Sequence, residues 1–162
     1  MSELHFEEDV ILLDLDVEKN EQVLEKMGRN LVDLGYVKES FIPAIVEREK
    51  EFATGLPTTS VSVAIPHTDA KHVNRKTISV GVLKSSVDFV IMGDDSETTP
   101  VQVVFMLAMD EPHSQLTLLQ DLMKLFQDES FLQQLIVEKD KRNAKQLIAN
   151  KLNLYSFKGG ES

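Results

Sequence analysis

The chain has 162 residues with a formal net charge of −10, and it contains no cysteine. This length suits one domain, and the lack of thiols excludes disulfides, thiolate catalysis and cysteine-rich zinc sites. The acidic balance leaves no basic footprint for nucleic acid or for an anionic membrane surface. No apolar run approaches the roughly 20 residues that span a bilayer. We therefore expect a cytoplasmic globular protein without direct membrane insertion.

The first part of the chain predicts one strand followed by two helices. The apolar run at 10–15 predicts a strand. Asn20 can cap a helix that Gly35 ends. A second helix is expected over about 40–52, with Pro43 in its first turn.

The remainder predicts alternating strands and helices, followed by a disordered tail. Strands are expected at 61–65, 77–83, 87–91 and 101–109, and helices at 114–126, from Ser130 to about 137, and at 144–152. This mixture indicates a sheet covered by helices, in an α/β or α+β sandwich. Of the two we expect an α/β fold, a single-domain sandwich with a mixed, mostly parallel sheet flanked by helices. We expect the domain to span 1–157 and the tail 158–162.

Histidines are the first candidates for chemistry, since imidazole suits carrying a charge or a group near neutral pH. His67 directly follows the predicted strand 61–65 and Pro66, and proline fixes its own backbone angle and restricts the residue before it. Ligands and active sites tend to lie at strand ends in α/β sheets. A strand-end histidine is nevertheless structural about half the time, so the pattern alone leaves both interpretations open.

Two further residues could complete a site around His67. His113 follows the apolar strand 101–109 and precedes a helix, so it could lie beside His67 if the two strands are neighbours, or it could simply cap the helix. Arg48 lies near the end of the second predicted helix, and its planar guanidinium matches phosphate oxygens. Among its acidic neighbours Arg48 could equally form a solvated ion pair.

His67, Asp69 and His72 form a close cluster that could indicate a metal site. Asp69 and His72 fit one helical turn, but the five-residue spacing of the histidines is awkward for a helix. No further carboxylate or cysteine motif completes a zinc signature. Metal chemistry is therefore the weaker interpretation of this cluster.

The segment Ala-Ile-Pro-His at 64–67 resembles the active-site motif of enzyme IIA domains of the bacterial sugar phosphotransferase system, within the fructose–mannitol superfamily. The similarity extends upstream through Arg48 and the Thr54-Gly55 pair. It extends downstream to His113 and its leucine-rich helix. Together these residues cover the chain from about residue 5 to 155, and the ordered set is more specific than the four-residue motif.

Within this superfamily the chain is most similar to the galactitol-type proteins. The resemblance rests on the segment 48–55, the long loop 55–66, and His72 soon after the active histidine. The chain departs from the common pattern at Thr68, where most members have a small residue. His113 is more similar to the mannitol and fructose branches. The resemblance therefore implies galactitol or a related polyol or sugar.

The resemblance implies a phosphoryl carrier. His67 would accept phosphate from the phosphohistidine of the carrier protein HPr and pass it to a cysteine of a IIB partner. Arg48 would clamp the phosphate oxygens and His113 would donate a hydrogen bond to them, with Thr54 and Thr68 as further phosphate-site residues. No cofactor or metal is implied. Contact with the membrane component IIC would be indirect, through IIB.

Three alternatives come from other functional classes. Nitrogen-type regulatory members of the superfamily share the histidine but signal through their phosphorylation state. A metal-dependent hydrolase would use His67, Asp69 and His72. A non-catalytic interaction domain would use its histidines structurally.

Overall fold

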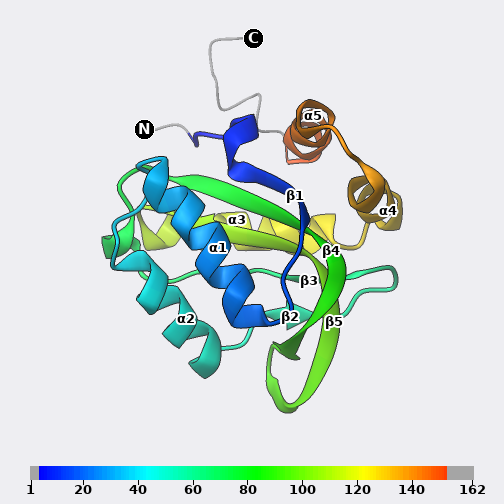
Figure 1. The fold of residues 1–162 in the computed structure, drawn as a ribbon, viewed down its shortest axis with the longest axis horizontal. Helices are drawn as coiled ribbons and strands as arrows, with labels where there is room; N and C mark the ends of the chain where they lie inside the picture. Colours follow the sequence, from blue (N-terminus) through cyan, green and yellow to red (C-terminus); the bar gives the residue numbers. More distant parts are fainter. Residues whose placement is uncertain (1–3, 153–162) are drawn as a thin grey trace.

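The computed structural model describes residues 4–152 (Figure 1). The expected domain end at residue 157 and the tail at 158–162 lie outside the described residues. In chain order the elements are the 3-10 helix η1 (Glu8–Val10), β1 (Ile11–Leu15), α1 (Asn20–Asp33), α2 (Phe41–Glu51), β2 (Gly55–Leu56), β3 (Ser62–Ala64), the 3-10 helix η2 (Ala70–His72), β4 (Thr77–Ile91), β5 (Asp94–Ala108), α3 (Pro112–Leu125), α4 (Glu129–Val137) and α5 (Lys141–Lys151).

The strands form one mixed sheet in the order β1-β4-β2-β3-β5, and β4 also pairs with β5. The pairings β1–β4, β2–β4 and β3–β5 are parallel. The pairings β2–β3 and β4–β5 are antiparallel. The expected mixed and mostly parallel sheet is confirmed, although its longest ladder is the antiparallel hairpin of β4 and β5.

The two strands expected at 77–83 and 87–91 are a single strand, β4. The ladder to β5 shifts register between Val82 and Val87, and the polar residues 84–86 at this point are exposed. Strand β5 also begins earlier than expected, at Asp94, because its polar first residues pair with β4 in the projecting half of the hairpin. Apolar patterning misses such segments because they bury little side-chain surface.

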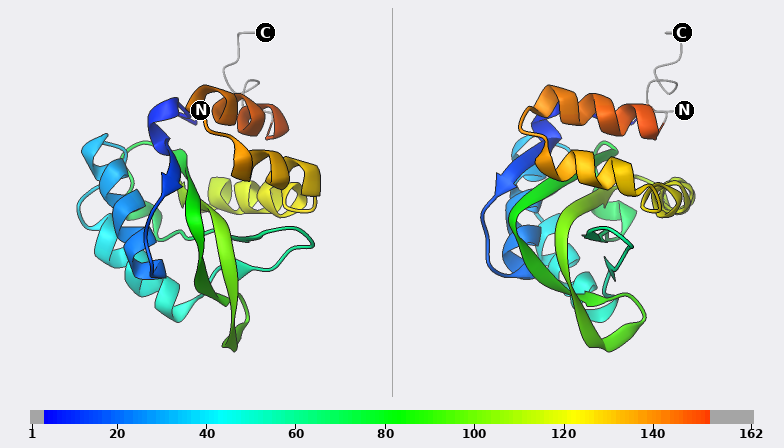
Figure 2. Two further views of the ribbon diagram at one scale, coloured as in Figure 1. Left: turned by 45° about the vertical axis from the view of Figure 1, so that its right-hand side comes forward. Right: turned by 90° about the vertical axis from the view of Figure 1, so that its right-hand side faces the viewer.

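Helices cover the sheet on both faces (Figure 2). Helices α1 and α2 lie on one side of the β4–β5 hairpin, and α3, α4 and α5 lie on the other. Residues 103–108 of β5 are all buried, as expected for a strand covered on both faces. None of the helices within 4–152 is long and apolar enough to cross a membrane.

Helix α1 confirms the predicted helix and its end. Its buried residues recur at helical spacing, and they are Val23, Leu24, Met27, Gly28 and Leu31. The N–H of Gly35 bonds to the Val32 carbonyl and the N–H of Tyr36 to that of Leu31, which is the Schellman arrangement. At the other end Asn20 is the first helical residue and Lys19 occupies the cap position, so the predicted Asn20 cap is wrong.

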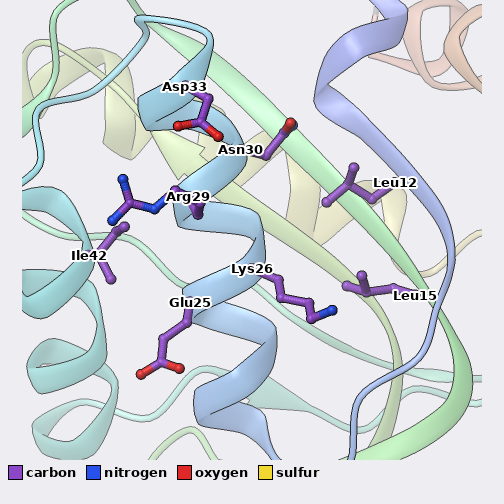
Figure 3. A pocket seen from close by; sticks show the side chains of 8 residues that line it. All are labelled: Leu12, Leu15, Glu25, Lys26, Arg29, Asn30, Asp33 and Ile42. Atoms are coloured by element: carbon purple, nitrogen blue, oxygen red, sulfur yellow. The ribbon is translucent and has the colours of Figure 1, made fainter.

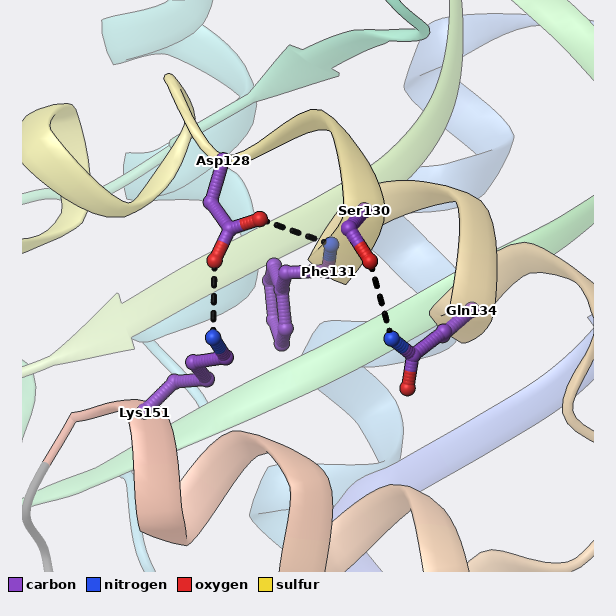
Figure 4. A network of polar contacts seen from close by, with 5 residues as sticks. All are labelled: Asp128, Ser130, Phe131, Gln134 and Lys151. Atoms are coloured by element: carbon purple, nitrogen blue, oxygen red, sulfur yellow. Dashed lines mark hydrogen bonds and ion pairs between the residues drawn. The ribbon is translucent and has the colours of Figure 1, made fainter.

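The cap of α4 is Asp128 and not Ser130 (Figure 4). The Asp128 carboxylate accepts the N–H of Phe131 at 3.1 Å, while the Ser130 hydroxyl, inside the helix, accepts from the Gln134 amide. Lys151, in the last turn of α5, binds the other Asp128 oxygen at 2.8 Å. Asp128 stands directly before the first helical residue, where a side-chain oxygen can accept a free N–H of the first turn, and here it also joins α5 to α4. The Lys151 bond and the Phe131 bond together lower the pKa of Asp128.

Candidate functional site

His67 lies just beyond the end of β3. The N–H of Leu107 in β5 donates to the carbonyl of Pro66 at 3.0 Å, so pairing between these chain segments continues past Ala64. Ile65 and Pro66 are buried, whereas His67 is half-buried. Pairing with β5 therefore fixes the backbone up to Pro66, and the His67 side chain lies beyond the carboxyl end of β3.

The His67 ring is fixed by its own strand. Its Nδ1 lies 2.8 Å from the carbonyl oxygen of Ile65. A carbonyl only accepts, so the neutral ring carries its proton on Nδ1 and leaves the Nε2 lone pair bare. Burial lowers the pKa of His67, the Ile65 bond opposes this shift, and the positive charge of Arg48 adds to it. The ring is therefore neutral and nucleophilic at Nε2 around pH 7.

Arg48 lies near the end of α2, and its guanidinium carbon lies 4.5 Å from the centre of the Phe52 ring. Its buried Nε has no hydrogen-bond partner. A buried unsatisfied donor on a cation calls for an explanation, and an anion held beside His67 would supply one. Among residues 4–152, Arg48 takes part in no ion pair, so the alternative of a solvated ion pair with its helical neighbours is wrong.

Glu49 is a buried member of this neighbourhood that the sequence analysis did not single out. Its side chain accepts two hydrogen bonds from Thr54, one from the backbone N–H at 2.8 Å and one from the hydroxyl at 2.9 Å. The Thr54 hydroxyl in turn accepts the N–H of Ile65 at 3.2 Å. The Thr54 hydroxyl thus donates its hydrogen bond to Glu49. Thr54 links α2 to the segment that leads from β3 to His67.

A signal for Glu49 was present in the sequence. The buried residues of α2 are Phe41, Ile45 and Glu49, which recur every fourth residue. This spacing places all three on one helix face. A carboxylate that continues an apolar stripe is rarely buried without hydrogen-bond partners.

His113 lies in the first turn of α3 and is exposed. Glu111 occupies the cap position of α3, so the alternative that His113 caps the helix is wrong. Because β3 and β5 are parallel neighbours, the segments that follow them leave the sheet at the same edge. The strands that precede His67 and His113 are therefore neighbours, which is the condition that the sequence analysis set for the two histidines to lie close together. Thr68 is buried directly after His67.

His72 belongs to a different set of contacts. Its Nδ1 lies 2.8 Å from the hydroxyl of Ser40, and its carbonyl accepts the N–H of Lys38. These bonds tie η2 to the segment that precedes α2. Within the described part of the chain, no three histidine or carboxylate side chains are grouped to hold a metal ion.

A surface hollow of about 600 Å³ lies elsewhere, between α1, β1 and α2 (Figure 3). It has leucine and isoleucine walls and charged rims on α1. None of the predicted site residues lines it, and its lining residues are Leu12, Leu15, Glu25, Lys26, Arg29, Asn30, Asp33 and Ile42.

Residues 4–151 match the family model described as "Phosphoenolpyruvate-dependent sugar phosphotransferase system, EIIA 2". The chain is 31% identical over 115 residues to the galactitol-specific EIIA component of Escherichia coli K12, covering 71% of this chain and 76% of that protein. It is 31% identical over 150 residues to the mannitol-specific phosphotransferase enzyme IIA component of Staphylococcus aureus N315, covering 91% and 96%.

Solved structures share the fold at lower identity. The crystal structure of IIA mannitol from Escherichia coli matches with a TM-score of 0.73 at 20% identity, covering 92% of this chain and 99% of that one. The Escherichia coli complex of enzyme IIA mannitol with phosphorylated enzyme IIB mannitol matches with a TM-score of 0.72 at 19% identity, covering 93% and 98%. Each match spans more than nine tenths of this chain.

Proposed function

Because this chain belongs to the EIIA 2 family of phosphoenolpyruvate-dependent sugar phosphotransferase systems, we propose that it carries phosphate on Nε2 of His67. The donor is the phosphohistidine of HPr, and the acceptor is a cysteine of a IIB partner. One observation carries the proposal: the bond from Nδ1 to the Ile65 carbonyl leaves Nε2 as the free nucleophile of a neutral ring.

In the first step, the Nε2 lone pair of His67 forms a bond to the phosphorus of the donor. The N–P bond of the donor breaks, and its electron pair returns to the donor nitrogen. In the second step, a IIB thiolate attacks the same phosphorus and the bond to Nε2 breaks. The proton stays on Nδ1, hydrogen-bonded to the Ile65 carbonyl, in both steps. Neither step therefore needs a base to remove a proton from His67.

Side chains around His67 stabilise the negative charge on the oxygens of the transferring phosphoryl group. Phosphoryl transfer passes through a loose transition state with charge spread over three oxygens, so alignment and charge stabilisation dominate catalysis. Arg48 clamps these oxygens, in keeping with its unpartnered buried Nε. His113 donates a hydrogen bond from the first turn of α3, and Thr68, buried directly after His67, is a further phosphate-site residue in this proposal. The Thr54 hydroxyl already donates its hydrogen bond to Glu49, so in this proposal it does not donate one to the phosphate.

Apolar side chains beside the site suit docking of protein partners. Phe52, which stacks under Arg48, is 59% exposed, and Leu116, in the turn after His113, is 55% exposed. Aromatic and other apolar side chains are enriched in the buried centres of protein–protein interfaces. In this proposal the chain works in the cytoplasm and reaches the membrane component IIC only through IIB. The relatives named above favour galactitol or another polyol as the transported compound.

Radiolabelled phosphate from phosphorylated HPr tests the assignment. The wild-type chain should take up label that acid removes and alkali does not, as expected for a phosphoramidate. His67→Ala should take up none, whereas the exposed His5→Ala, which makes the same truncation, should label like the wild type. Undiminished labelling of His67→Ala would overturn the proposal. A wild-type chain that takes label but passes none to any IIB protein of the same organism would favour the regulatory alternative.

A further inference from the structure

We propose that Glu49 is a positioning residue for phosphoryl transfer, acting on His67 through Thr54 and Ile65. This inference rests on the function proposed above. It adds a buried group on α2 that touches neither phosphate nor partner. Glu49 is 6% exposed, so its influence passes through the protein interior.

The hydrogen bonds run in one direction from the strand to Glu49. The N–H of Ile65 donates to the Thr54 hydroxyl at 3.2 Å, and that hydroxyl donates to one Glu49 oxygen at 2.9 Å. The other Glu49 oxygen accepts the N–H of Thr54 at 2.8 Å. Bonds aligned in this way polarise and strengthen one another. The segment between α2 and β2 is thus bonded to α2 through both the backbone and the side chain of Thr54.

Ile65 is where this chain of bonds meets the reacting histidine. Its N–H points to Thr54, while its carbonyl accepts Nδ1–H of His67 at 2.8 Å. On the opposite side, the carbonyl of Pro66 is held by the N–H of Leu107. The peptide that sets the His67 ring is therefore fixed from α2 and from β5. Loss of the α2 contact would free the Ile65 backbone to turn, and with it the carbonyl that selects the Nδ1–H tautomer.

The site requires an acceptor with two oxygens. Thr54 presents two donors to Glu49, and a carboxylate accepts both. A glutamine of the same shape has one oxygen and one NH₂ group, so one of the two donors would meet another donor. Burying a carboxylate is unfavourable: burial raises the pKa of Glu49 to about 7, and the two Thr54 bonds offset only part of that shift. A chain that needed only packing at this position would be more stable with an apolar residue.

Glu49→Gln is the direct test, with Glu47→Gln as the matched control. Glu47 is exposed on the same helix, so its variant makes the same substitution without breaking the Thr54 bonds. With phosphorylated HPr as donor, we expect Glu49→Gln to lower kcat about tenfold while KM for HPr changes less than about twofold. Glu47→Gln should match the wild type in kcat. In ¹⁵N spectra of the histidine rings, His67 of Glu49→Gln should lose part of its Nδ1–H population.

Variants at Thr54 keep the test decisive if Glu49→Gln does not fold. Thr54→Val removes the hydroxyl and should lower kcat and shift the tautomer in the same way, whereas Thr54→Ser keeps the hydroxyl and should restore both. A wild-type kcat and an unchanged His67 tautomer in the folded variants would overturn this inference. Equal losses in Thr54→Ser and Thr54→Val would also overturn it, because they would implicate the methyl group. A wild-type chain that cannot be labelled on His67 would instead overturn the function proposed above.

Discussion

Nδ1 of His67 lies 2.8 Å from the carbonyl oxygen of Ile65, two residues earlier in the same strand segment. The strand that delivers the histidine thereby also selects its tautomer. Burial and the nearby Arg48 charge lower the pKa of the ring, and so keep it neutral. The backbone geometry of this segment thus leaves the lone pair of Nε2 free.

The lowered pKa of His67 predicts how phosphoryl acceptance depends on pH. Its ordinary value is 6.5, and only the neutral ring has a free lone pair at Nε2. The rate should therefore stay constant through neutral pH and fall as the pH drops through the lowered pKa. Titration of the His67 ring protons by NMR should give a midpoint below 6.5, and Arg48→Ala should raise that midpoint. A wild-type midpoint above 6.5 would contradict the burial argument.

Replacing Arg48 should slow transfer strongly. Arg48→Ala removes the charge that we propose to clamp the phosphate oxygens, and we expect a loss of about 10²- to 10³-fold in rate. Arg48→Lys keeps the charge but not the planar fork, so it should recover only part of the rate. Single-turnover transfer from phosphorylated HPr measures both. Arg29→Ala is the control, because Arg29 is a surface residue paired with Glu39; equal rates for all four proteins would rule out the clamp.

His113→Ala should affect transfer and leave stability unchanged. The side chain is exposed in the first turn of α3, so its removal should shift the free energy of unfolding by less than about 0.5 kcal/mol. Loss of one hydrogen bond to a charged group is worth about 1.5–3 kcal/mol, or about 10- to 100-fold in rate. Transfer kinetics and urea unfolding, measured side by side, separate the two effects. A destabilised variant with normal kinetics would assign His113 a structural role.

The buried Glu49 predicts that the free energy of unfolding falls as the pH rises. Its pKa rises from 4.5 to about 7 on folding, so below pH 4.5 the carboxyl is protonated in both states and the native state bears no charge there. Between pH 4.5 and about 7 the unfolded carboxyl is ionised while the native one is still protonated, so the contribution of Glu49 to stability falls across this range by up to about 3 kcal/mol and stays low above it. Urea unfolding at pH 5 and pH 8 should therefore show a drop for the wild type that is smaller in Glu49→Gln. The same drop in both proteins would place the titrating group elsewhere.

Close backbone approach at Gly55 predicts a large effect from one methyl group. A Cβ at this position would lie 2.6 Å from the Val90 carbonyl oxygen, since β2 is pressed against the end of β4. Gly55→Ala should destabilise by about 1–3 kcal/mol through overpacking. In the hairpin turn, Gly93 has a positive φ but open space around it, so Gly93→Ala should lose only about 1 kcal/mol. Thermal unfolding of Gly55→Ala and Gly93→Ala measures both losses of stability. Equal losses would show that the close approach of Gly55 to the Val90 carbonyl is not what makes Gly55→Ala destabilising.

Much of this architecture was predictable because the signals were local. Apolar spacing and Gly35 gave α1 and its end, and the apolar run of β5 gave a strand covered on both faces. The joining of two expected strands into β4 was not predictable, because the exposed residues 84–86 break the apolar pattern while the ladder to β5 continues around them. Pairing partners fix such a strand, and a single segment does not reveal them.

The sequence pointed to His67, Arg48 and His113 as candidate site residues but not to the buried Glu49 behind them. Position after a strand end identified His67 and His113, and the family resemblance joined them to Arg48. Glu49 was passed over because charged residues are usually exposed, and because its partner Thr54 becomes adjacent only when the chain turns after α2. The hydrogen bonds between Glu49, Thr54 and Ile65 depend on tertiary contacts that residue types alone do not give.

The central claim is that His67 carries phosphate on Nε2 while Nδ1 stays bonded to the Ile65 carbonyl. The most direct measurement is a histidine-selective ¹⁵N and ³¹P NMR spectrum of the chain after phosphorylation by HPr. We predict one phosphorus signal coupled to Nε2 of His67, with the proton retained on Nδ1. Coupling to Nδ1 of His67, or to a ring nitrogen of any other histidine, would contradict the account.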